Sequence, residues 1–317
     1  VSEMKAGNYD IAEMPADQLD SYKDASNLNL VGSLESAYEY ISFNLGKYDE
    51  ASEKNIMDEN AKMNDVKLRQ AIAYAIDTKT AGEKLYNGLY HPATSLIISF
   101  FGDLHDSEVE GYSYDPDKAN ELLDEAGYKD VDGDGIREGK DGKEFKITFA
   151  ARKRTEANEA LVQQYIAWWK EVGLNVELYT GRTVEINTFY DAVQANDPSI
   201  DMYAGGWSTG YDPNPNGLWG ETAPFNMSRF VDEKNTELLD AIGSVASFDE
   251  KTNLKNYKAW QEYAFEQAFA IPTFESEAIT ALNKRVKNFD TNYGSASENG
   301  IALENIELTA DKGVAAE

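Results

Sequence analysis

The order of secondary-structure elements expected between residues 145 and 204 constrains the fold of this chain most strongly. Short apolar or alternating runs predict strands, and apolar side chains at helical spacing that end at a glycine, as at Gly173, predict helices. Strands are expected at 145–149, 176–179 and 199–204, and helices at 155–172 and 184–195. A strand–helix–strand–helix–strand order at this spacing indicates an α/β layer whose strands are at least partly parallel.

The last of these strands leads into two glycines and a tryptophan. The run Gly205-Gly206-Trp207 is followed by a loop that contains Gly210, Asp212 and two prolines. We expect the strand to break at the glycines, which have no side chain and let a backbone or a ligand approach closely. Proteins of the α/β class commonly build ligand clefts where a strand opens into a loop. The sequence therefore predicts that Trp207 lines a cleft, and the alternative is a surface loop with a tryptophan in the core.

The chain is strongly acidic and contains no cysteine. Its 317 residues carry 57 acidic and 29 basic side chains, a formal net charge of −28, which argues against nucleic acid or an anionic lipid surface as a partner. Without cysteine there is no disulfide, thiol catalysis or zinc–thiolate site. No apolar run reaches the roughly 20 residues that span a bilayer, and the polar start at Val1 carries no signal peptide. We therefore expect a soluble protein that is cytosolic or whose start has been removed.

Residues 130–141 have the spacing of a Ca²⁺-binding loop. Gly135 stands at position 6 of the loop, where such a site turns sharply, whereas Arg137 at position 8 and an aspartate at position 12 depart from the usual pattern. Hard oxygen ligands around a tight turn suit Ca²⁺, which would have a structural role here. The alternative is a solvated turn whose carboxylates hydrogen-bond their own backbone. The candidate ligands are Asp130, Asp132, Asp134, the carbonyl of Ile136, Glu138 and Asp141.

Catalytic constellations are absent from the sequence. The two histidines, His91 and His105, lie outside any HxxxH or HExxH spacing, and there is no GxSxG elbow, P-loop or GxGxxG after a strand. The many carboxylates leave a glycosidase acid/base pair open, but nothing selects one. A binding module is therefore expected in preference to an enzyme, and no cofactor is required.

Several segments, in the same order along the chain, resemble the oligopeptide/dipeptide ABC transporter extracellular substrate-binding proteins, solute-binding family 5. The longest is VKLRQAIAYAID at 66–77, and LLDEAGY at 122–128 is followed by DGDGIR at 132–137. Further segments lie at 5–12, 40–44, 114–116, 206–207 and 226–239.

The resemblance implies a periplasmic-binding-protein-like α/β fold of the type II class, with two lobes around a ligand cleft. Residues 1–40 are then the C-terminal end of the first segment of lobe one. Residues 41–270 are lobe two and form half of the cleft, and residues 271–317 return to lobe one. The chain would be the C-terminal portion of a longer protein, without its signal and lipidation site. The whole protein is expected to be a monomeric cell-surface lipoprotein tethered to the membrane.

The resemblance also implies a function and a binding site. Members of the family hold an extended oligopeptide between the lobes, close over it and deliver it to ABC permease subunits. A family motif, GWxxDY, supplies an aspartate that pairs with the α-amino group of the peptide. Gly210 occupies that position here, so either Asp212 replaces the aspartate or longer peptides bind without a grip on their end. The alternative for Asp212 is a cap of the Asp-Pro turn.

The predicted peptide-binding residues form one set around the end of the strand. We expect the aromatic side chains of Trp207, Tyr211 and Trp219 to be exposed on the cleft face. The full set of predicted contacts is Trp207, Ser208, Gly210, Tyr211, Asp212 and Asn226.

Two other classes of protein remain open. The aromatic residues and carboxylates suit a sugar-binding module or an acidic glycoside hydrolase. The acidic loop suits a Ca²⁺-stabilised surface or adhesin-like protein. Peptide binding predicts open strand edges in a cleft, sugar binding predicts a stacked aromatic platform, and an adhesin predicts no cleft.

Overall fold

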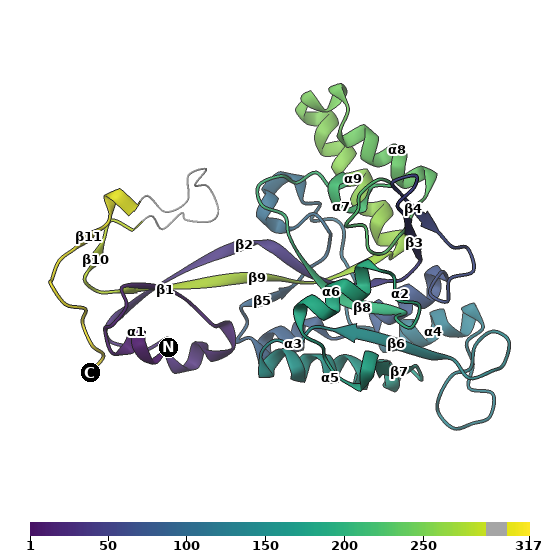
Figure 1. Cartoon of the computed structure of the whole chain (residues 1–317), viewed down its shortest axis with the longest axis horizontal. Coiled ribbons are helices and arrows are strands. Elements are labelled where there is room, and N and C mark those ends of the chain that lie inside the picture. The colour runs from purple at the N-terminus through teal and green to yellow at the C-terminus, as the bar shows by residue number, and fades with distance from the viewer. Residues whose placement is uncertain (290–302) are drawn as a thin grey trace.

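The computed structural model describes residues 1–289 and 303–317. They form a large α/β body and a small unit, which a long two-stranded ribbon joins (Figure 1). The ribbon consists of β2 (Leu28–Phe43) and β9 (Ala270–Asn283), which pair antiparallel along most of their length. The ends of the ribbon at Phe43 and Ala270 lie in the core of the body.

One mixed sheet runs from the small unit through the ribbon into the body. Its strand order is β1-β9-β2-β8-β6-β7, and β5 also pairs with β9. β6 pairs parallel with β7 and with β8, whereas the ribbon strands pair antiparallel with their neighbours. The predicted partly parallel α/β layer is therefore confirmed. Besides β2 and β9, the strands of this sheet are β1 (Ile11–Met14), β5 (Tyr90–Pro92), β6 (Lys146–Ala151), β7 (Asn175–Leu178) and β8 (Met202–Ser208).

Among the described residues, two shorter strand pairs lie outside this sheet. In the body, β3 (Gly46–Asp49) pairs with β4 (Lys54–Met57). In the small unit, β10 (Val286–Lys287) pairs with β11 (Glu307–Leu308).

The helices of the body begin and end where the local sequence favours it. Helix α4 (Pro116–Ala126) follows Asp115, whose carboxylate accepts a hydrogen bond from the backbone N–H of Lys118, and it stops at Gly127 with φ of 93°. An aspartate cap, a proline in the first turn and a left-handed glycine are typical helix boundaries. The other helices are α1 (Ser2–Lys5), α2 (Val66–Tyr74), α3 (Thr78–Leu85), α5 (Glu156–Glu171), α6 (Ile186–Gln194), α7 (Asn216–Trp219), α8 (Glu233–Ile242) and α9 (Glu250–Gln267).

Buried apolar side chains form two cores. The large core fills the body, where the indole of Trp169 in α5 donates to the carbonyl of Ile72 in α2 at 3.0 Å. The small core lies at the other end of the ribbon and consists of Met4, Met14, Tyr22, Leu28, Leu89, Ile279 and Ala281. The ribbon is therefore anchored in a separate core at each end.

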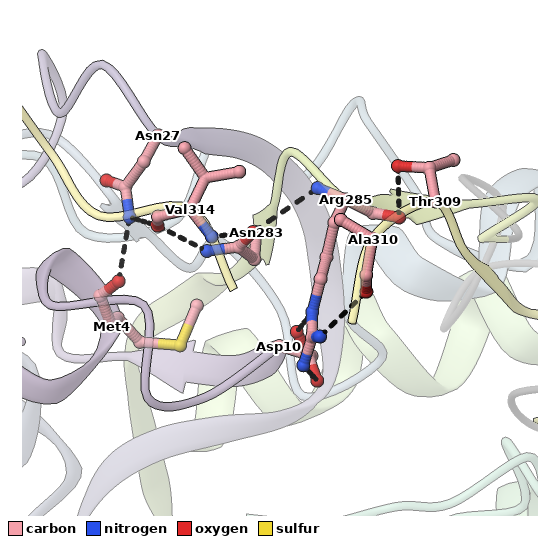
Figure 2. A network of polar contacts seen from close by, with 8 residues as sticks. All are labelled: Met4, Asp10, Asn27, Asn283, Arg285, Thr309, Ala310 and Val314. Atoms are coloured by element: carbon pink, nitrogen blue, oxygen red, sulfur yellow. Dashed lines mark hydrogen bonds and ion pairs between the residues drawn. The ribbon is translucent and has the colours of Figure 1, made fainter. Parts of the chain in front are cut away.

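Polar contacts hold three segments of the small unit together (Figure 2). The buried amide of Asn27 donates to the carbonyl of Val314 at 2.7 Å, and Asn283 exchanges two hydrogen bonds with the backbone of Val314. Arg285 contacts both carboxylate oxygens of Asp10, at 2.6 and 2.7 Å. Segments from the two ends of the chain thus belong to one unit with the outer end of the ribbon.

Candidate functional site

The two glycines of β8 do not break the strand, and this corrects the prediction. β8 continues to Ser208, and its residues Gly205 and Gly206 lie opposite Tyr40 and Glu39 of β2. A Cβ atom at Gly205 would lie 2.8 Å from Cζ of the Tyr40 ring, and one at Gly206 would lie 2.9 Å from Nη2 of Arg152. These distances are shorter than van der Waals contact, so the missing side chains make room for neighbouring protein side chains. Close approach of a ligand is not needed to explain the glycines.

The end of β8 has one open backbone edge. On one side, β6 pairs with β8 from Met202 to Ala204, and within the described part of the chain no strand continues that pairing. On the other side, the N–H of Thr209 donates to Ser36 at 2.8 Å and so extends the ladder with β2. Alternate residues of an antiparallel ladder face the partner strand. The backbone groups of Gly206 and Ser208 therefore face this edge, where the carbonyl of Gly206 also accepts a hydrogen bond from the hydroxyl of Tyr190 at 3.5 Å.

Trp207 and Tyr211 lie at this end of the sheet. Trp207 is partly buried, and its ring centroid lies 5.7 Å from that of Phe225. Tyr211 is 65% exposed and lies 6.3 Å from the ring of Phe100. Trp207 is thus not a fully buried core residue, and its contact with a ligand stays a prediction. Ser208 is exposed, and Gly210 adopts a positive φ of 59°.

Asp212 is exposed and takes part in the turn that follows. Its Oδ1 accepts a hydrogen bond from the backbone N–H of Asn214 at 3.0 Å, which is the turn-capping role considered for it. Because the carboxylate is exposed, the cap leaves it in contact with solvent. The suggestion that Asp212 binds the α-amino group of a peptide stays a prediction.

Asn226 of the predicted site and Trp219, which was expected on the cleft face, are both buried. Asn226 is fully buried, and its side chain donates to the carbonyl of Phe230 at 3.0 Å and accepts from the hydroxyl of Ser228 at 2.7 Å. Its amide is therefore used within the protein and does not face a cleft. Trp219 is 2% exposed and packs 5.6 Å from the Tyr40 ring, so the expectation that it is an exposed cleft aromatic is wrong.

The acidic loop brings three of its predicted ligands together. Carboxylate oxygens of Asp130, Asp132 and Glu138 lie within 4.8 Å of one another, and Asp130 also accepts hydrogen bonds from two backbone N–H groups of the loop. Asp134 lies outside this group of three. Its carboxylate accepts a hydrogen bond from the backbone N–H of Ile136, whose carbonyl is another of the predicted ligands. The loop therefore has features of both alternatives, converging carboxylates and a turn that bonds its own backbone.

Contacts with residues outside the loop hold Asp141 and Arg137 in place. Asp141 pairs with Lys143 at 2.9 Å. Arg137, which departs from the calcium pattern, points out of the loop and donates to the carbonyl of Val172 at 2.9 Å and to the side chain of Asn120 at 2.9 Å. Arg137 thus holds the loop against α4 and the end of α5.

A charged cluster that was not predicted lies beside the open edge of β8. Glu39 of β2 pairs through one oxygen with Arg152, at 2.9 Å, and through the other with Arg154, at 2.5 Å. Both arginines follow the carboxyl end of β6, where ligand sites of α/β sheets commonly lie. The run Arg152-Lys153-Arg154 after a predicted strand was the signal in the sequence, since basic residues are few in this chain.

Tyrosines surround the charged cluster. The Tyr86 and Tyr90 rings stack with centroids 4.0 Å apart, and both line a pocket with the arginines and Glu39. Burial, with a smaller contribution from Tyr90, raises the pKa of the Tyr86 phenol well above its ordinary value. These phenols are therefore neutral at physiological pH and act as hydrogen-bonding groups.

A second hollow adjoins this pocket and lies between the body and the small unit. Tyr86, Tyr90 and Arg154 line both cavities. On the side of the small unit it is lined by residues 13–17, and on the side of the ribbon by Glu35 and Glu277 among others. The two cavities together connect the end of β8 to the outer part of the ribbon.

No helix in the described ranges, 1–289 and 303–317, is long and apolar enough to cross a membrane.

Comparison with known proteins identifies the family of the chain. A family model described as bacterial extracellular solute-binding proteins, family 5 (middle), matches residues 1–229. Oligopeptide-binding protein OppA of Lactococcus lactis subsp. cremoris (strain SK11) is 35% identical over 301 residues, which are 93% of this chain and 50% of that protein. Oligopeptide-binding protein AppA of Bacillus subtilis (strain 168) is 25% identical over 275 residues, 85% of this chain and 47% of that protein.

A solved structure of a peptide-binding protein is also similar to this chain. Lactococcal OppA, complexed with an endogenous peptide in the closed conformation, matches 90% of this chain and 53% of that chain, with a TM-score of 0.85 and 34% identity. The chain spans about half the length of the curated relatives it matches. These relatives are binding proteins by name, in agreement with the expectation of a binding module, and they do not favour a glycoside hydrolase or an adhesin. The resemblance seen in the sequence is confirmed, and the chain belongs to the bacterial extracellular solute-binding proteins of family 5.

Proposed function

We propose that this chain supplies one lobe and the hinge strands of an oligopeptide-binding component of an ABC importer. The observation that carries the proposal is the match, at a TM-score of 0.85, to a structure of OppA with a peptide bound. In this proposal the whole protein is an extracytoplasmic lipoprotein that binds its peptide as a monomer and delivers it to permease subunits at the membrane.

We propose the same division into lobes that the sequence suggested, with residues 41–270 as lobe two and residues 1–40 and 271–317 as parts of lobe one. The separate core at each end of the ribbon supports this division. The pairing of β2 with β9 shifts register between Leu34 and Tyr38, and again between Glu39 and Tyr40. Such bulges bend and twist a strand locally. The first shift lies between the two cores, and the second lies at the edge of the core of the body, which includes Tyr38 and Tyr40. In the proposal, closure of the lobes bends the ribbon at the first shift.

The open edge of β8 is the proposed place of peptide binding. An extended peptide that pairs with this edge would use the backbone groups of Gly206 and Ser208, in the manner of an added strand. The side chains of Trp207, Tyr211 and Asp212 would then lie along its path. Low sequence selectivity follows, because backbone groups are common to all peptides.

The proposal predicts that both lobes are needed for tight binding. A peptide held by one lobe gains pairing on one side only, whereas ordering it costs about 1–2 kcal/mol per residue. The experiment is calorimetric titration of mixed oligopeptides into this chain and into a longer protein that joins it to the rest of lobe one. We expect micromolar or tighter binding by the longer protein and weak binding by the chain. Equal affinities would contradict the two-lobe proposal.

A backbone substitution tests the open edge within the longer protein. Ser208→Pro removes one N–H that faces the open edge and leaves the ladder with β2 intact, since proline is tolerated at strand edges. Loss of one hydrogen bond of about 0.5–1.5 kcal/mol weakens binding roughly two- to thirteenfold. Ser208→Ala is the matched control and keeps the N–H. Equal affinities of the two variants would show that peptides do not pair with this edge.

The structural Ca²⁺ site in the acidic loop also stays a proposal, supported by the three converging carboxylates. Ca²⁺ bound only to the folded chain would raise its melting temperature. We expect a chelator to lower the melting temperature and added Ca²⁺ to restore it, with Asp130→Asn insensitive to both. An unchanged melting temperature with chelator would leave the loop as a solvated turn held by Arg137.

A further inference from the structure

A tight turn between α3 and β5 reaches from the body into the small unit. Its two central residues have positive φ, 54° at Asn87 and 78° at Gly88, and the N–H of Leu89 donates to the carbonyl of Tyr86 at 2.9 Å. Positive φ at both central residues and the pair Asn-Gly are typical of a type I′ turn. The local sequence therefore favours the conformation of this linking turn, residues 86–89.

The two ends of the linking turn belong to different cores. Tyr86 is 6% exposed and is part of the large core of the body, whereas Leu89 is 9% exposed and is part of the small core. Three residues span at most about 10–11 Å when they are fully extended, and here they are folded into a turn. The linking turn therefore allows the two cores little separation at this point.

Hydrogen bonds hold the linking turn on the side of the small unit. The side-chain amide of Asn87 donates to the carbonyl of Ala16 at 2.8 Å, and the carbonyl of Leu89 accepts from the N–H of Glu277 at 2.8 Å. Ala16 packs against the small core, and Glu277 belongs to β9. The turn is thus bonded both to the small unit and to the ribbon.

Other contacts hold the linking turn on the side of the body. The N–H of Gly88 donates to the carbonyl of Gly82 in α3 at 3.0 Å, and the rings of Tyr86 and Tyr90 stack with centroids 4.0 Å apart. A Cβ atom at Gly82 would overlap the carbonyl oxygen of Tyr90, so α3 packs directly on β5. The turn is therefore carried by the body and cannot move far from it.

The linking turn meets the ribbon where the pairing of β2 with β9 first shifts register. Leu34 lies opposite Glu277 at one side of this shift, and Tyr38 lies opposite Glu275 at the other. The hydrogen bond from Glu277 to Leu89 is therefore made at the edge of the shift. Hinges bend through a few residues that absorb changes in φ and ψ. A bend at the shift would move the small unit relative to the body, and the linking turn contacts both.

We propose that the linking turn is a hinge element beside the two ribbon strands, which pins the lobes together so that they rotate about it without separating there. This inference rests on the proposed division into two lobes. The pin narrows the range of lobe orientations before peptide arrives. It thereby raises the fraction of molecules in the orientation that binds peptide, and the apparent affinity rises with that fraction.

The distance between two spin labels tests the pin in this chain, without any peptide. The chain contains no cysteine, so Asp24→Cys in the small unit and Glu262→Cys in α9, both exposed positions, give two unique attachment sites. Two glycines inserted after Gly88 lengthen the link by up to roughly 7 Å. We expect double electron–electron resonance to show a distance distribution that is broader by several ångströms than in the labelled chain without the insertion.

Insertion of the same two glycines after Gly142 is the matched control. Gly142 is exposed and has a positive φ of 73°, and nothing lies within 4 Å of the Cβ position at either Gly142 or Gly88. The control changes a turn of the same kind away from the two cores, and we expect it to leave the distance distribution unchanged.

A second pair of variants changes no chain length. Asn87→Asp keeps the shape of the side chain and tolerates a positive φ, but it removes the N–H that Ala16 accepts. Asn288→Asp is its control, because Asn288 is exposed, has a φ of 58° and gains the same charge. We expect a broader distance distribution in Asn87→Asp only. This pair decides the question if the insertion after Gly88 abolishes cooperative melting.

The possible results separate the pin from the proposed function. If the two insertions broaden the distribution equally, or neither broadens it, the pin is refuted. In the longer protein, the insertion after Gly88 is expected to weaken binding of mixed oligopeptides about threefold or more relative to the insertion after Gly142. Equal affinities would refute the effect of the pin on binding. If the longer protein binds no peptide at all, the proposed function fails, whereas the distances still decide whether the pin exists.

Discussion

Alanine at Gly205 is expected to destabilise the chain by crowding a buried ring. The new Cβ would lie 2.8 Å from Cζ, 3.0 Å from the hydroxyl oxygen and 3.2 Å from Cε2 of Tyr40. Tyr40 is 3% exposed and packs against the rings of Tyr38, Tyr203 and Trp219 at 5.7, 6.2 and 5.6 Å. Apart from the small cavity of about 30 Å³ that it lines, the ring is enclosed by other rings, so it can move little without displacing them. Overpacking of this kind costs about 1–3 kcal/mol, and we expect about 2 kcal/mol.

Two other glycines serve as internal comparisons. At Gly206 the new Cβ would meet the ends of the Arg152 and Glu39 side chains, which can rotate away, so Gly206→Ala is expected to cost less than about 1 kcal/mol. At Gly217, in helix α7, nothing lies within 4 Å of the Cβ position. Gly217→Ala is expected to be neutral or slightly stabilising, since alanine favours helices.

Urea unfolding followed by tryptophan fluorescence and far-ultraviolet circular dichroism measures these differences. For Gly205→Ala we also expect a fall in melting temperature of roughly 4–8 °C, at about 2–4 °C per kcal/mol for large domains. The steric argument is refuted if Gly205→Ala unfolds at the same urea concentration as Gly217→Ala. If Gly205→Ala instead loses peptide binding at unchanged stability, the glycine is needed for close approach of a ligand, as the sequence first suggested.

Two further predictions concern buried phenols and the small unit. Burial, followed by the charge of Asp65, raises the pKa of Tyr128 to about 12. Because the folded-state pKa lies above the ordinary value, the stabilisation is complete below about pH 10 and is lost as the pH rises towards 12. Urea midpoints between pH 9 and 12 should therefore fall less steeply in Tyr128→Phe than in the unchanged chain, and equal slopes would contradict this. Asp10→Asn removes the partner of Arg285, so limited proteolysis should release the last residues of the chain faster than in the surface control Asp20→Asn; equal rates would show that the pair does not anchor them.

Local sequence signals determined several elements of this protein. The cap at Asp115, the proline after it and Gly127 set both ends of α4, since all three act through the backbone of neighbouring residues. The spacing of apolar runs between 145 and 204 gave the order of β6, α5, β7, α6 and β8, and the short connections made the parallel pairing of β6 with its neighbours the expected arrangement. The segments that resemble family 5 then indicated the family, because related proteins keep the same fold along with such shared segments.

Tertiary structure alone decided which side chains are available at the candidate site. Glu39 and Arg152 are 113 positions apart and meet only because β2, β8 and β6 are neighbours in one sheet. Trp219 and Asn226 have residue types common at binding surfaces, yet both are buried, since burial depends on what packs over a residue and not on its own type. The glycines of β8 show the same distinction. The sequence by itself indicated two positions that favour glycine. Only the packing of Tyr40 and Arg152 against them showed that neighbouring side chains are sufficient reason for the missing Cβ atoms.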